Sequence, residues 1–273
     1  MPTPDPNPAD VPVVVLCGGQ GTRIREASEK LPKPLINIGN QPMLWHIMKL
    51  YSSHGFRRFV LCLGYKGWDI KQYFLEYQDM MSDMTVHTRG GNDKTYLTEH
   101  RLDDWEVSLV DTGLDTGTGG RIAKVGPLID TDYFMVTYGD GLGDVDLSAE
   151  LSSLARSDYL GLVTGVHPTS RYGELGVQPD GLVVNFAEKP SSEGWVSGGF
   201  FAFRREFLSY LPVDEDDHFF EHDPMKRLTH DGRLGLFPHT GFWMGMDTFR
   251  EYTALNEMWE RGETPWLPAG TVD

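Results

Sequence analysis

The chain has 273 residues, with 24 Lys and Arg against 40 Asp and Glu, for a formal net charge of −16. This length is enough for one large domain with a full hydrophobic core. The acidic balance argues against nonspecific nucleic-acid binding, which depends on basic surfaces. No run of about 18 or more apolar residues occurs, so the sequence predicts no membrane span.

The cysteine content and the amino-terminal segment indicate the cellular compartment of the protein. Cys17 and Cys62 are too few for a disulfide framework and too far apart for a metal or redox pair. A reducing cytoplasm is therefore the expected location. Residues 1–12 are rich in proline and lack an apolar segment, so we expect a disordered or extended tail and not a signal peptide.

The first predicted element is a buried strand over 11–16, mostly β-branched and interrupted only by Pro12. It leads into Cys17-Gly18-Gly19-Gln20-Gly21-Thr22-Arg23. The glycines permit a tight turn in which several N–H groups converge, a geometry that suits an anion. Arg23 adds a fork of donors that fits phosphate, and Lys33 adds a further positive charge. The stretch therefore predicts a polyphosphate site.

Two common phosphate motifs do not match this stretch. A P-loop needs Lys-Ser/Thr directly after its last glycine, and no such pair follows Gly21. A dinucleotide fingerprint needs a glycine where this chain has Ile24. The alternative is an ordinary strand-to-helix glycine turn, which the added Thr22-Arg23 and Lys33-Pro34 make the weaker interpretation.

The next segments alternate between helix and strand patterns. Apolar spacing predicts a helix over 42–53, a buried strand over 59–63 and a second amphipathic helix over 68–81. This rhythm indicates an α/β fold, with a parallel sheet and helices on its faces. Residues 82–104 are polar, and we expect them to extend away from the core and to form little β-strand. Residues 105–110 alternate between apolar and polar side chains, which predicts a strand.

A second glycine-rich turn, at 111–121, is expected to lie against a ligand, because open sheets bind ligands beyond the carboxyl ends of their strands. A flexible surface loop is the alternative. The strand over 133–138 then delivers Gly139-Asp140-Gly141. A carboxylate between two glycines at a buried strand end suits Mg²⁺, and an Asx turn is the alternative.

The second half of the chain predicts a mixed extension of the sheet that can bind an acceptor, with strands over 159–166, 172–177, 182–186 and 196–203. Glycines in the last strand indicate the close approach of a ligand or of backbone. Glu188-Lys189 can meet sugar hydroxyls and a phosphate, although such a pair is usually a solvated turn. Asp247 is either the N-cap of the final helix or a second metal ligand.

The segment His218-Phe219-Phe220-Glu221-His222 matches the inverted zinc-protease spacing His-x-x-Glu-His. It follows an acidic run, lies beside Pro224 and has no obvious third ligand. We therefore favour packing aromatic residues with surface histidines over a zinc site.

Taken together, these motifs make the chain resemble the sugar-1-phosphate nucleotidyltransferases, and more closely their glucose-1-phosphate cytidylyltransferase branch. The likeness extends from about Val13 to Leu267 and includes 42–49, 64–67, 109–113, 118–121, 137–141, 241–243 and 246–248. It implies one domain over 13–268, with a nucleotide-binding half (13–145) and a smaller β-rich, sugar-phosphate-binding half (146–268). The implied fold is Rossmann-like: a mixed, mostly parallel sheet flanked by helices, the nucleotide-diphospho-sugar transferase fold.

The resemblance also implies roles for single residues. Arg23 and Lys33 would be catalytic, and Asp140 and Asp247 would bind Mg²⁺. The implied nucleotide contacts are Leu16, Cys17, Gly18, Gly19, Gln20, Gly21, Thr22, Thr116, Gly120, Arg121 and Gly139. The implied sugar-phosphate contacts are Gly173, Glu188, Lys189 and Ser197. CTP and a sugar 1-phosphate would be the ligands, and the family implies a homo-oligomer.

Two positions depart from the family pattern: Ser197 stands where the family usually has Asn, and Leu31 where it often has Lys. The implied reaction converts CTP and α-D-glucose 1-phosphate into CDP-glucose and pyrophosphate. A phosphate monoester has a second pKa of about 6, so a dianionic acceptor needs no general base. Charge neutralisation and positioning then supply the catalysis.

The base and the sugar stay open at this point. Arg121 carries only donors, which suit the neighbouring O2 and N3 acceptors of cytosine better than the N3–H of uracil. The alternatives are the same reaction with UTP or dTTP, another sugar 1-phosphate, or a catalytically silent nucleotide-sugar-binding protein.

Overall fold

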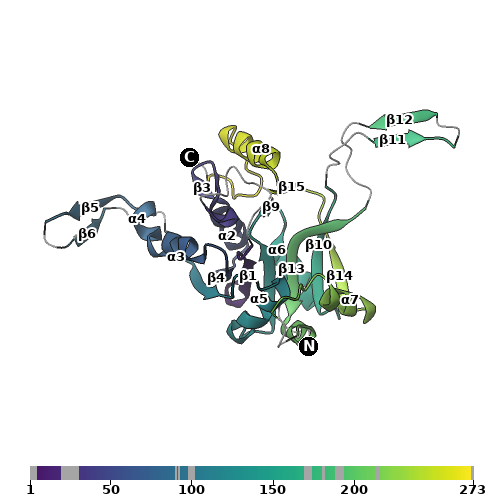
Figure 1. Cartoon of the computed structure of the whole chain (residues 1–273), viewed down its shortest axis with the longest axis horizontal. Helices are drawn as coiled ribbons and strands as arrows, with labels where there is room; N and C mark the ends of the chain where they lie inside the picture. The colour runs from purple at the N-terminus through teal and green to yellow at the C-terminus, as the bar shows by residue number, and fades with distance from the viewer. Residues whose placement is uncertain are drawn as a thin grey trace.

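A seven-stranded sheet in the order β14-β10-β13-β8-β1-β4-β7 forms the centre of the computed structural model (Figure 1). The structure describes residues 5–19, 31–89, 91, 93–97, 102–168, 174–179, 182–187, 194–212 and 216–271, with the backbone alone at 174–177 and 184–187. The strands are β1 (Pro12–Leu16), β4 (Arg58–Leu63), β7 (Glu106–Asp111), β8 (Tyr133–Tyr138), β10 (Gly161–Val166), β13 (Val196–Arg204) and β14 (Leu234–Pro238). All but β13 run in one direction, which confirms the predicted mixed, mostly parallel sheet.

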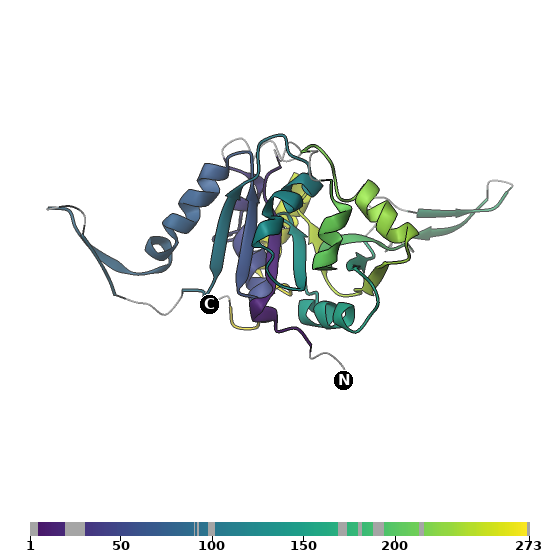
Figure 2. The ribbon, with the colours of Figure 1, turned by 90° about the horizontal axis from the view of Figure 1, so that it is seen from below.

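Helices cover both faces of this sheet (Figure 2). They are α2 (Met43–Ser53), α3 (Gly67–Leu75), α4 (Tyr77–Met81), α5 (Thr118–Val125), α6 (Leu147–Ala155), α7 (Asp223–His230) and α8 (Phe249–Glu260). Successive strand residues point to opposite faces. Val13 and Val15 accordingly join the core beneath α2 and α6, whereas Val14 and Leu16 join the core beneath α5 and α7.

The order of the strands creates a crevice at one edge of the sheet. The chain runs from β1 to β4 and β7 on one side, and then returns to β8 on the other side of β1. The carboxyl ends of these four parallel strands therefore meet at the same edge. A reversal of this kind is where open α/β sheets bind their ligands.

Strand β13 brings the second half of the chain to that edge. Because β13 is antiparallel to β8, its first residues lie beside the end of β8. A bulge interrupts its pairing with β10: the register moves from Val163↔Phe201 to Gly165↔Ser197. Gly199 accommodates the bulge with a φ of +81°, a conformation that glycine adopts without a steric penalty.

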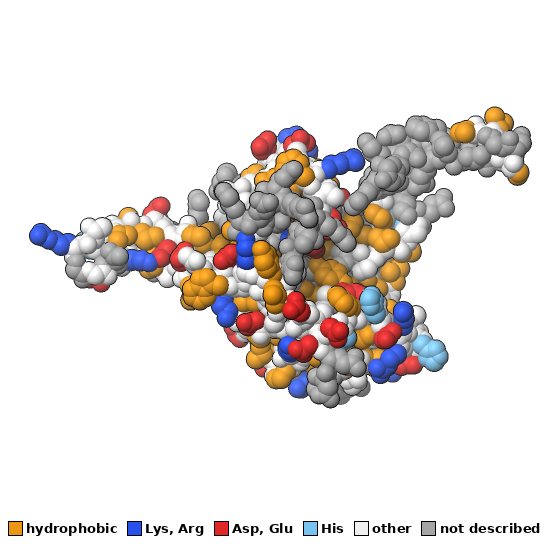
Figure 3. Space-filling view, in the orientation of Figure 1, with side chains coloured by type: hydrophobic (Ala, Val, Ile, Leu, Met, Phe, Trp, Pro, Cys, Tyr) orange, Lys and Arg blue, Asp and Glu red, His pale blue; other side chains and the backbone are white. Residues whose placement is uncertain are grey.

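Two β-hairpins project from the body in opposite directions (Figure 1). One consists of β5 (Met84–His87) and β6 (Asp93–Tyr96), and the other of β11 (Glu174–Val177) and β12 (Val183–Ala187). The exposed side chains of Leu182 and Val183 lie on the second hairpin, whose tip shows hydrophobic atoms in Figure 3. Both regions were predicted to be weak or short strands, but an extension beyond the body was not predicted for the second.

Several local predictions differ from the structure. The helix expected over 68–81 is two helices separated at Glu76. The expected tail is folded from residue 5 onward: Pro8–Asp10 form a 3₁₀ helix that Asn7 caps, and Val11 is buried. Disorder is therefore the wrong prediction for 5–12, because Arg58 Nη1 donates to the Asp10 carbonyl at 2.9 Å and ties this segment to β4. Residues 1–4 lie outside the described residues.

The small strands β2 (Asn37–Ile38), β3 (Gln41–Pro42), β9 (Gly141–Gly143) and β15 (Trp243–Gly245) complete the described fold, with 3₁₀ helices η1 (Pro8–Asp10), η2 (Lys33–Leu35), η3 (Gly126–Leu128) and η4 (Arg205–Tyr210). Helices α5, α6 and α7 were not predicted. Within the part of the chain that the structure describes, no helix is long and apolar enough to cross a membrane.

Candidate active site

Lys33 joins two carboxylates at the edge of the sheet. Its Nζ lies 2.7 Å from Asp140 Oδ2 and 3.0 Å from Asp247 Oδ1. Asp140 follows β8, Asp247 follows β15, and Lys33 begins the 3₁₀ helix η2. Burial by itself would lower the pKa of Lys33, but the charges and hydrogen bonds of the two aspartates outweigh burial and raise this pKa. The ammonium therefore stays charged. These three residues are called the junction below.

Asp247 is not the N-cap of the last helix. The cap of α8 is Thr248, which forms a capping box with Glu251. The N-cap alternative for Asp247 is therefore wrong, and its carboxylate faces Lys33.

A cavity of about 340 Å³ lies on one side of the junction, beyond the ends of β1 and β8. We call it the strand-end cavity. It is lined by the junction and by Leu16, Cys17, Gly18, Gly19, Pro34, Thr116, Thr118, Arg121, Tyr138, Gly139 and Phe219. All but four of these (Pro34, Thr118, Tyr138 and Phe219) were expected in the site from the sequence. The predicted residues Gln20, Gly21, Thr22 and Arg23 lie outside the described residues.

A second cavity, of about 310 Å³, lies on the other side of the junction against the bulge of β13. We call it the bulge cavity. Its lining residues are Thr137, Tyr138, Asp140, Gly141, Ser197, Gly198, Gly199, Trp243, Gly245 and Asp247. It therefore shares Tyr138, Asp140 and Asp247 with the strand-end cavity. Ser197 lies here as a predicted acceptor contact, whereas Gly173, Glu188 and Lys189 lie outside the described residues.

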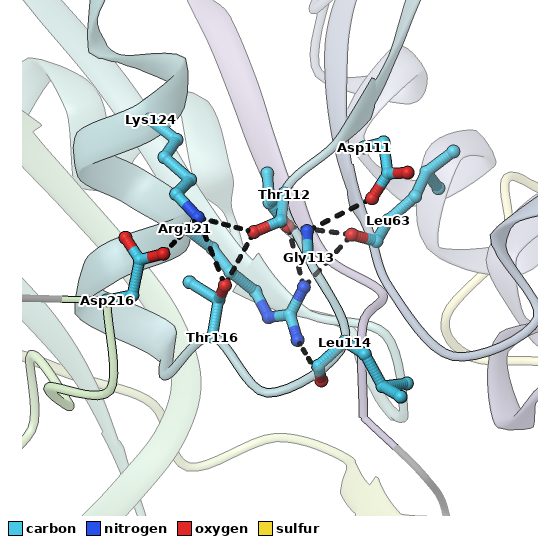
Figure 4. A network of polar contacts seen from close by, with 9 residues as sticks. All are labelled: Leu63, Asp111, Thr112, Gly113, Leu114, Thr116, Arg121, Lys124 and Asp216. Atoms are coloured by element: carbon cyan, nitrogen blue, oxygen red, sulfur yellow. Dashed lines mark hydrogen bonds and ion pairs between the residues drawn. The ribbon is translucent and has the colours of Figure 1, made fainter.

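Arg121 fixes the floor of the strand-end cavity (Figure 4). Its Nη1 donates to the Leu63 carbonyl at 3.0 Å and to Thr112 Oγ1 at 2.6 Å. Its Nη2 donates to the carbonyls of Gly18 and Leu114, both at 3.3 Å. The guanidinium thus ties together the loops that follow β1, β4 and β7. Its Nη groups bind protein acceptors in this structure, and base recognition by Arg121 stays a prediction.

Cys17 lines the same cavity as an uncharged group. Its thiol is buried, and burial raises its pKa well above the ordinary value. Since the thiolate is the reactive form of cysteine, Cys17 has no role as a nucleophile. It acts as a small apolar wall of the cavity.

The second glycine-rich turn packs against protein. Helix α5 begins at Thr118, so the expected turn ends at Gly117, four residues earlier than predicted. Gly117 N donates to the Asp216 carbonyl at 2.8 Å and Gly119 N to the His218 carbonyl at 3.1 Å. A Cβ at Gly119 would come within 2.3 Å of His218 Cδ2. These glycines therefore admit the segment 216–220, and Gly120, a predicted nucleotide contact, packs against Asp216.

Glu221 of the His-x-x-Glu-His segment also turns toward this site. Its carboxylate accepts hydrogen bonds from Tyr138 Oη and Thr118 Oγ1. Among the described residues, no group of three or more His, Cys, Asp and Glu side chains is placed to hold a metal ion. The importance of Tyr138 was missed, although the last residue of a strand before Gly-Asp-Gly is placed to face a ligand.

An open α/β sheet with two cavities that share Tyr138, Asp140 and Asp247 can bring two ligands together. The sequence matches the nucleotidyl transferase family over residues 12–261, and the chain belongs to that family. This confirms the family expected from the motifs.

Relatives that are 40% identical to this chain include two with the following names. One is the "Probable glucose-1-phosphate cytidylyltransferase" of Bacillus subtilis, aligned over 253 residues, which are 93% of this chain and 98% of the relative. The other is the "Glucose-1-phosphate cytidylyltransferase" of Salmonella typhi, over 93% of this chain and 97% of the relative. The crystal structure of HddC from Yersinia pseudotuberculosis superposes with a TM-score of 0.66 at 24% identity, covers 91% of this chain and 99% of HddC, and supports the fold alone.

Proposed function

We propose that this protein transfers the cytidylyl group of CTP to α-D-glucose 1-phosphate, giving CDP-glucose and pyrophosphate. The observation that carries the proposal is the pair of cavities that share Tyr138, Asp140 and Asp247, because the reaction needs a nucleotide and a sugar phosphate side by side. The names of the two 40% identical relatives favour cytosine and glucose over other bases and sugars.

In the proposed reaction the strand-end cavity holds CTP and the bulge cavity holds the sugar phosphate. A phosphate oxygen of the acceptor attacks the α-phosphorus of CTP, and the bond from this phosphorus to the bridging oxygen of the β-phosphate breaks. Pyrophosphate leaves with the electrons of that bond. The acceptor is already dianionic, so no residue needs to remove a proton.

The main task of the protein is to reduce the repulsion between two anions. Lys33 has a charged ammonium at the boundary of the two cavities, where the α-phosphate and the acceptor phosphate would meet. A fixed cation at this position stabilises the charge that develops in the transition state. We assign the same task to Arg23 from the sequence, with Lys189 and Glu188 holding the sugar phosphate together with Gly173 and Ser197.

The junction fits a magnesium ion. The carboxylates of Asp140 and Asp247 converge on one cation, the Lys33 ammonium, and carboxylate oxygens are the ligands that Mg²⁺ prefers. We propose that these two aspartates hold Mg²⁺ when substrates bind. Mg²⁺ would supply further neutralisation of phosphate charge.

The test is release of pyrophosphate with glucose 1-phosphate and Mg²⁺, run in parallel with CTP, UTP, dTTP and ATP. Release with CTP alone is expected. Release with another nucleotide would overturn the cytidylyl assignment but keep the reaction class. Binding of nucleotide with no release from any combination, tested also with other hexose 1-phosphates, would support a catalytically silent binding protein instead.

We also propose a homo-oligomer in the cytoplasm. An isolated two-stranded hairpin is marginally stable in water, and both projecting hairpins would gain support from a second copy of the chain. The free thiols of Cys17 and Cys62 suit a reducing compartment. Light scattering on the purified protein measures the number of subunits, and a monomer at all concentrations would contradict the proposal.

A further inference from the structure

We propose that Glu221 is a positioning residue for the transfer reaction, holding Tyr138 and Thr118 so that the two cavities stay aligned at the junction. This inference rests on the proposed function, and deepens it by giving a role to a carboxylate that lines neither the strand-end cavity nor the bulge cavity.

The first contact concerns the wall between the cavities. Tyr138 ends β8, directly before Gly139 and Asp140, and lines both cavities. Its hydroxyl donates to one oxygen of the Glu221 carboxylate. Glu221 therefore fixes the tyrosine two residues before the aspartate of the junction.

The second contact concerns the nucleotide side. Thr118 is the first residue of α5 and lines the strand-end cavity. Its Oγ1 donates to the other oxygen of the Glu221 carboxylate and accepts from Phe220 N at 3.3 Å. One carboxylate thus joins the end of β8 to the start of α5. Hydrogen bonds to a charged acceptor are about twice as strong as neutral ones.

The segment that carries Glu221 is itself anchored. Phe220 is fully buried, and its ring packs against Phe201 at 5.2 Å and against Tyr138 at 6.4 Å between centroids. The backbone carbonyl of His218 accepts from Gly119 N at 3.1 Å. Glu221 therefore has a fixed position relative to β13 as well as to α5, and it can transmit that position to Tyr138.

Misalignment of the two substrates lowers the turnover rate more than it weakens substrate binding. Misplacement of reacting groups by about 1 Å can cost about a hundredfold in rate, whereas a nucleotide held by many contacts loses little affinity when one wall moves. Because Tyr138 borders both cavities, loosening it shifts Asp140 relative to both substrates. The expected signature is therefore a fall in kcat with a small change in the Kd for CTP.

The experiment compares E221A and E221Q with the wild type in pyrophosphate release and in calorimetric binding of CTP without acceptor. We expect kcat to fall at least about tenfold in E221A while the Kd for CTP changes less than about threefold. E221Q can still accept from Tyr138 and donate to Thr118, and should recover most of kcat. Y138F should lower kcat in the same direction, and E221A combined with Y138F should cost no more than E221A.

The control is a second tyrosine–carboxylate pair outside the cavities. Tyr210 Oη donates to Asp231 Oδ2 at 2.8 Å, and neither residue lines the cavities or the junction. D231A should leave kcat unchanged, and circular dichroism checks the folding of each variant.

If the wild type is active, three results would overturn this inference and leave the proposed function standing. They are a kcat within twofold of wild type in E221A, a loss of kcat in D231A equal to that in E221A, and no recovery of kcat in E221Q. If E221A does not fold, the inference is tested with E221Q and Y138F, and an unchanged kcat in Y138F would overturn the inference. A wild type inactive with all four nucleotides would overturn the proposed function and this inference together.

Discussion

The two cavities rest on buried ionisable side chains of opposite kinds. Arg121 lies under the strand-end cavity, 5% exposed, and its Nη groups donate to three carbonyls and one hydroxyl. Glu150 of α6 is fully buried under β10 and β13, the strands beside the bulge cavity. Neither oxygen of its carboxyl group has a hydrogen-bond partner among the described residues.

The comparison of Arg121 with Glu150 shows when a buried ionisable side chain keeps its charge. Backbone carbonyls converge where parallel strands end, and they surround the Arg121 guanidinium with acceptors (Figure 4). Near Glu150, burial outweighs the hydroxyl of Thr164, which favours the charged form, and raises the pKa of Glu150 to about 8. We therefore expect the strand-end cavity to depend on the permanent charge of Arg121. We expect Glu150, beneath the strands beside the bulge cavity, to be a neutral acid near pH 7.

Lys33 should give the largest effect, because its ammonium bridges the two aspartates that line both cavities. K33A removes the ammonium between Asp140 and Asp247 and leaves both carboxylates beside the substrate phosphates. We expect kcat to fall about 10³-fold, the range known for cations that stabilise phosphoryl transfer. Pyrophosphate release measures it, with the exposed Lys226 replaced as K226A for control. A K33A enzyme with near-native kcat would remove Lys33 from the mechanism.

Loss of Arg121 should mainly destabilise the nucleotide side. R121A removes four hydrogen bonds of a charged donor, although the Gly18 and Leu63 carbonyls and the Thr112 hydroxyl each keep another partner. A hydrogen bond to a charged group contributes about 1.5–3 kcal/mol, so we expect the free energy of unfolding to fall by about 3 kcal/mol or more. Urea denaturation measures this change.

The same variant separates two roles of Arg121. If Arg121 acts through the loops, R121A lowers kcat/KM for CTP and for UTP by the same factor. A selective loss with CTP would show instead that its guanidinium reads the cytosine base.

Glu150 should make stability depend on pH. The native state keeps a proton up to about pH 8, whereas the unfolded chain releases it near the ordinary value of 4.5. Since the native state binds more protons between these values, the free energy of unfolding falls as pH rises, by about 2 kcal/mol from pH 6 to pH 8. E150Q has no such proton, so its stability should change less over this range. Equal slopes in the two proteins would place a charged, compensated Glu150 in the native state.

The fold could be predicted because its signals are local. Buried β-branched strands, helical apolar spacing and glycine turns at strand ends gave the parallel sheet, and the cradle at Cys17–Gly19, Lys33 and Asp140 lies at its carboxyl edge. What could not be predicted depends on contacts distant in sequence. The glycines of 117–120 allow close packing of a segment about 100 residues later, and that packing has no signal in spacing alone. The capping box of Thr248 and Glu251, by contrast, is a local Thr-x-x-Glu spacing that was missed.

At the junction, unlike at Arg121 and Glu150, we expect one positive charge to be replaced by another: the Lys33 ammonium by a bound Mg²⁺ ion. If Mg²⁺ takes the place of the Lys33 ammonium between the two aspartates, then K33M should bind a divalent ion more tightly when nucleotide is absent. We expect about a tenfold lower Kd for Mn²⁺, measured by electron paramagnetic resonance, because the ion no longer competes with an internal cation. D140N should weaken binding and K226M should leave it unchanged. Weaker binding in K33M would mean that Lys33 does not occupy the metal position.

The smallest expected effect is on the acceptor side, at Ser197. Its Oγ accepts from Gly199 N at 3.3 Å within the bulge, and the family usually has Asn at this position. An amide can donate as well as accept, so S197N should add one hydrogen bond to the sugar phosphate. A net hydrogen bond is worth about 0.5–1.5 kcal/mol, and we expect the KM for glucose 1-phosphate to fall about threefold with the KM for CTP unchanged. S209N, on the exposed η4, is the matched control. A change in the KM for CTP instead would show that Ser197 acts on the nucleotide side, and that the two cavities do not divide the substrates as proposed.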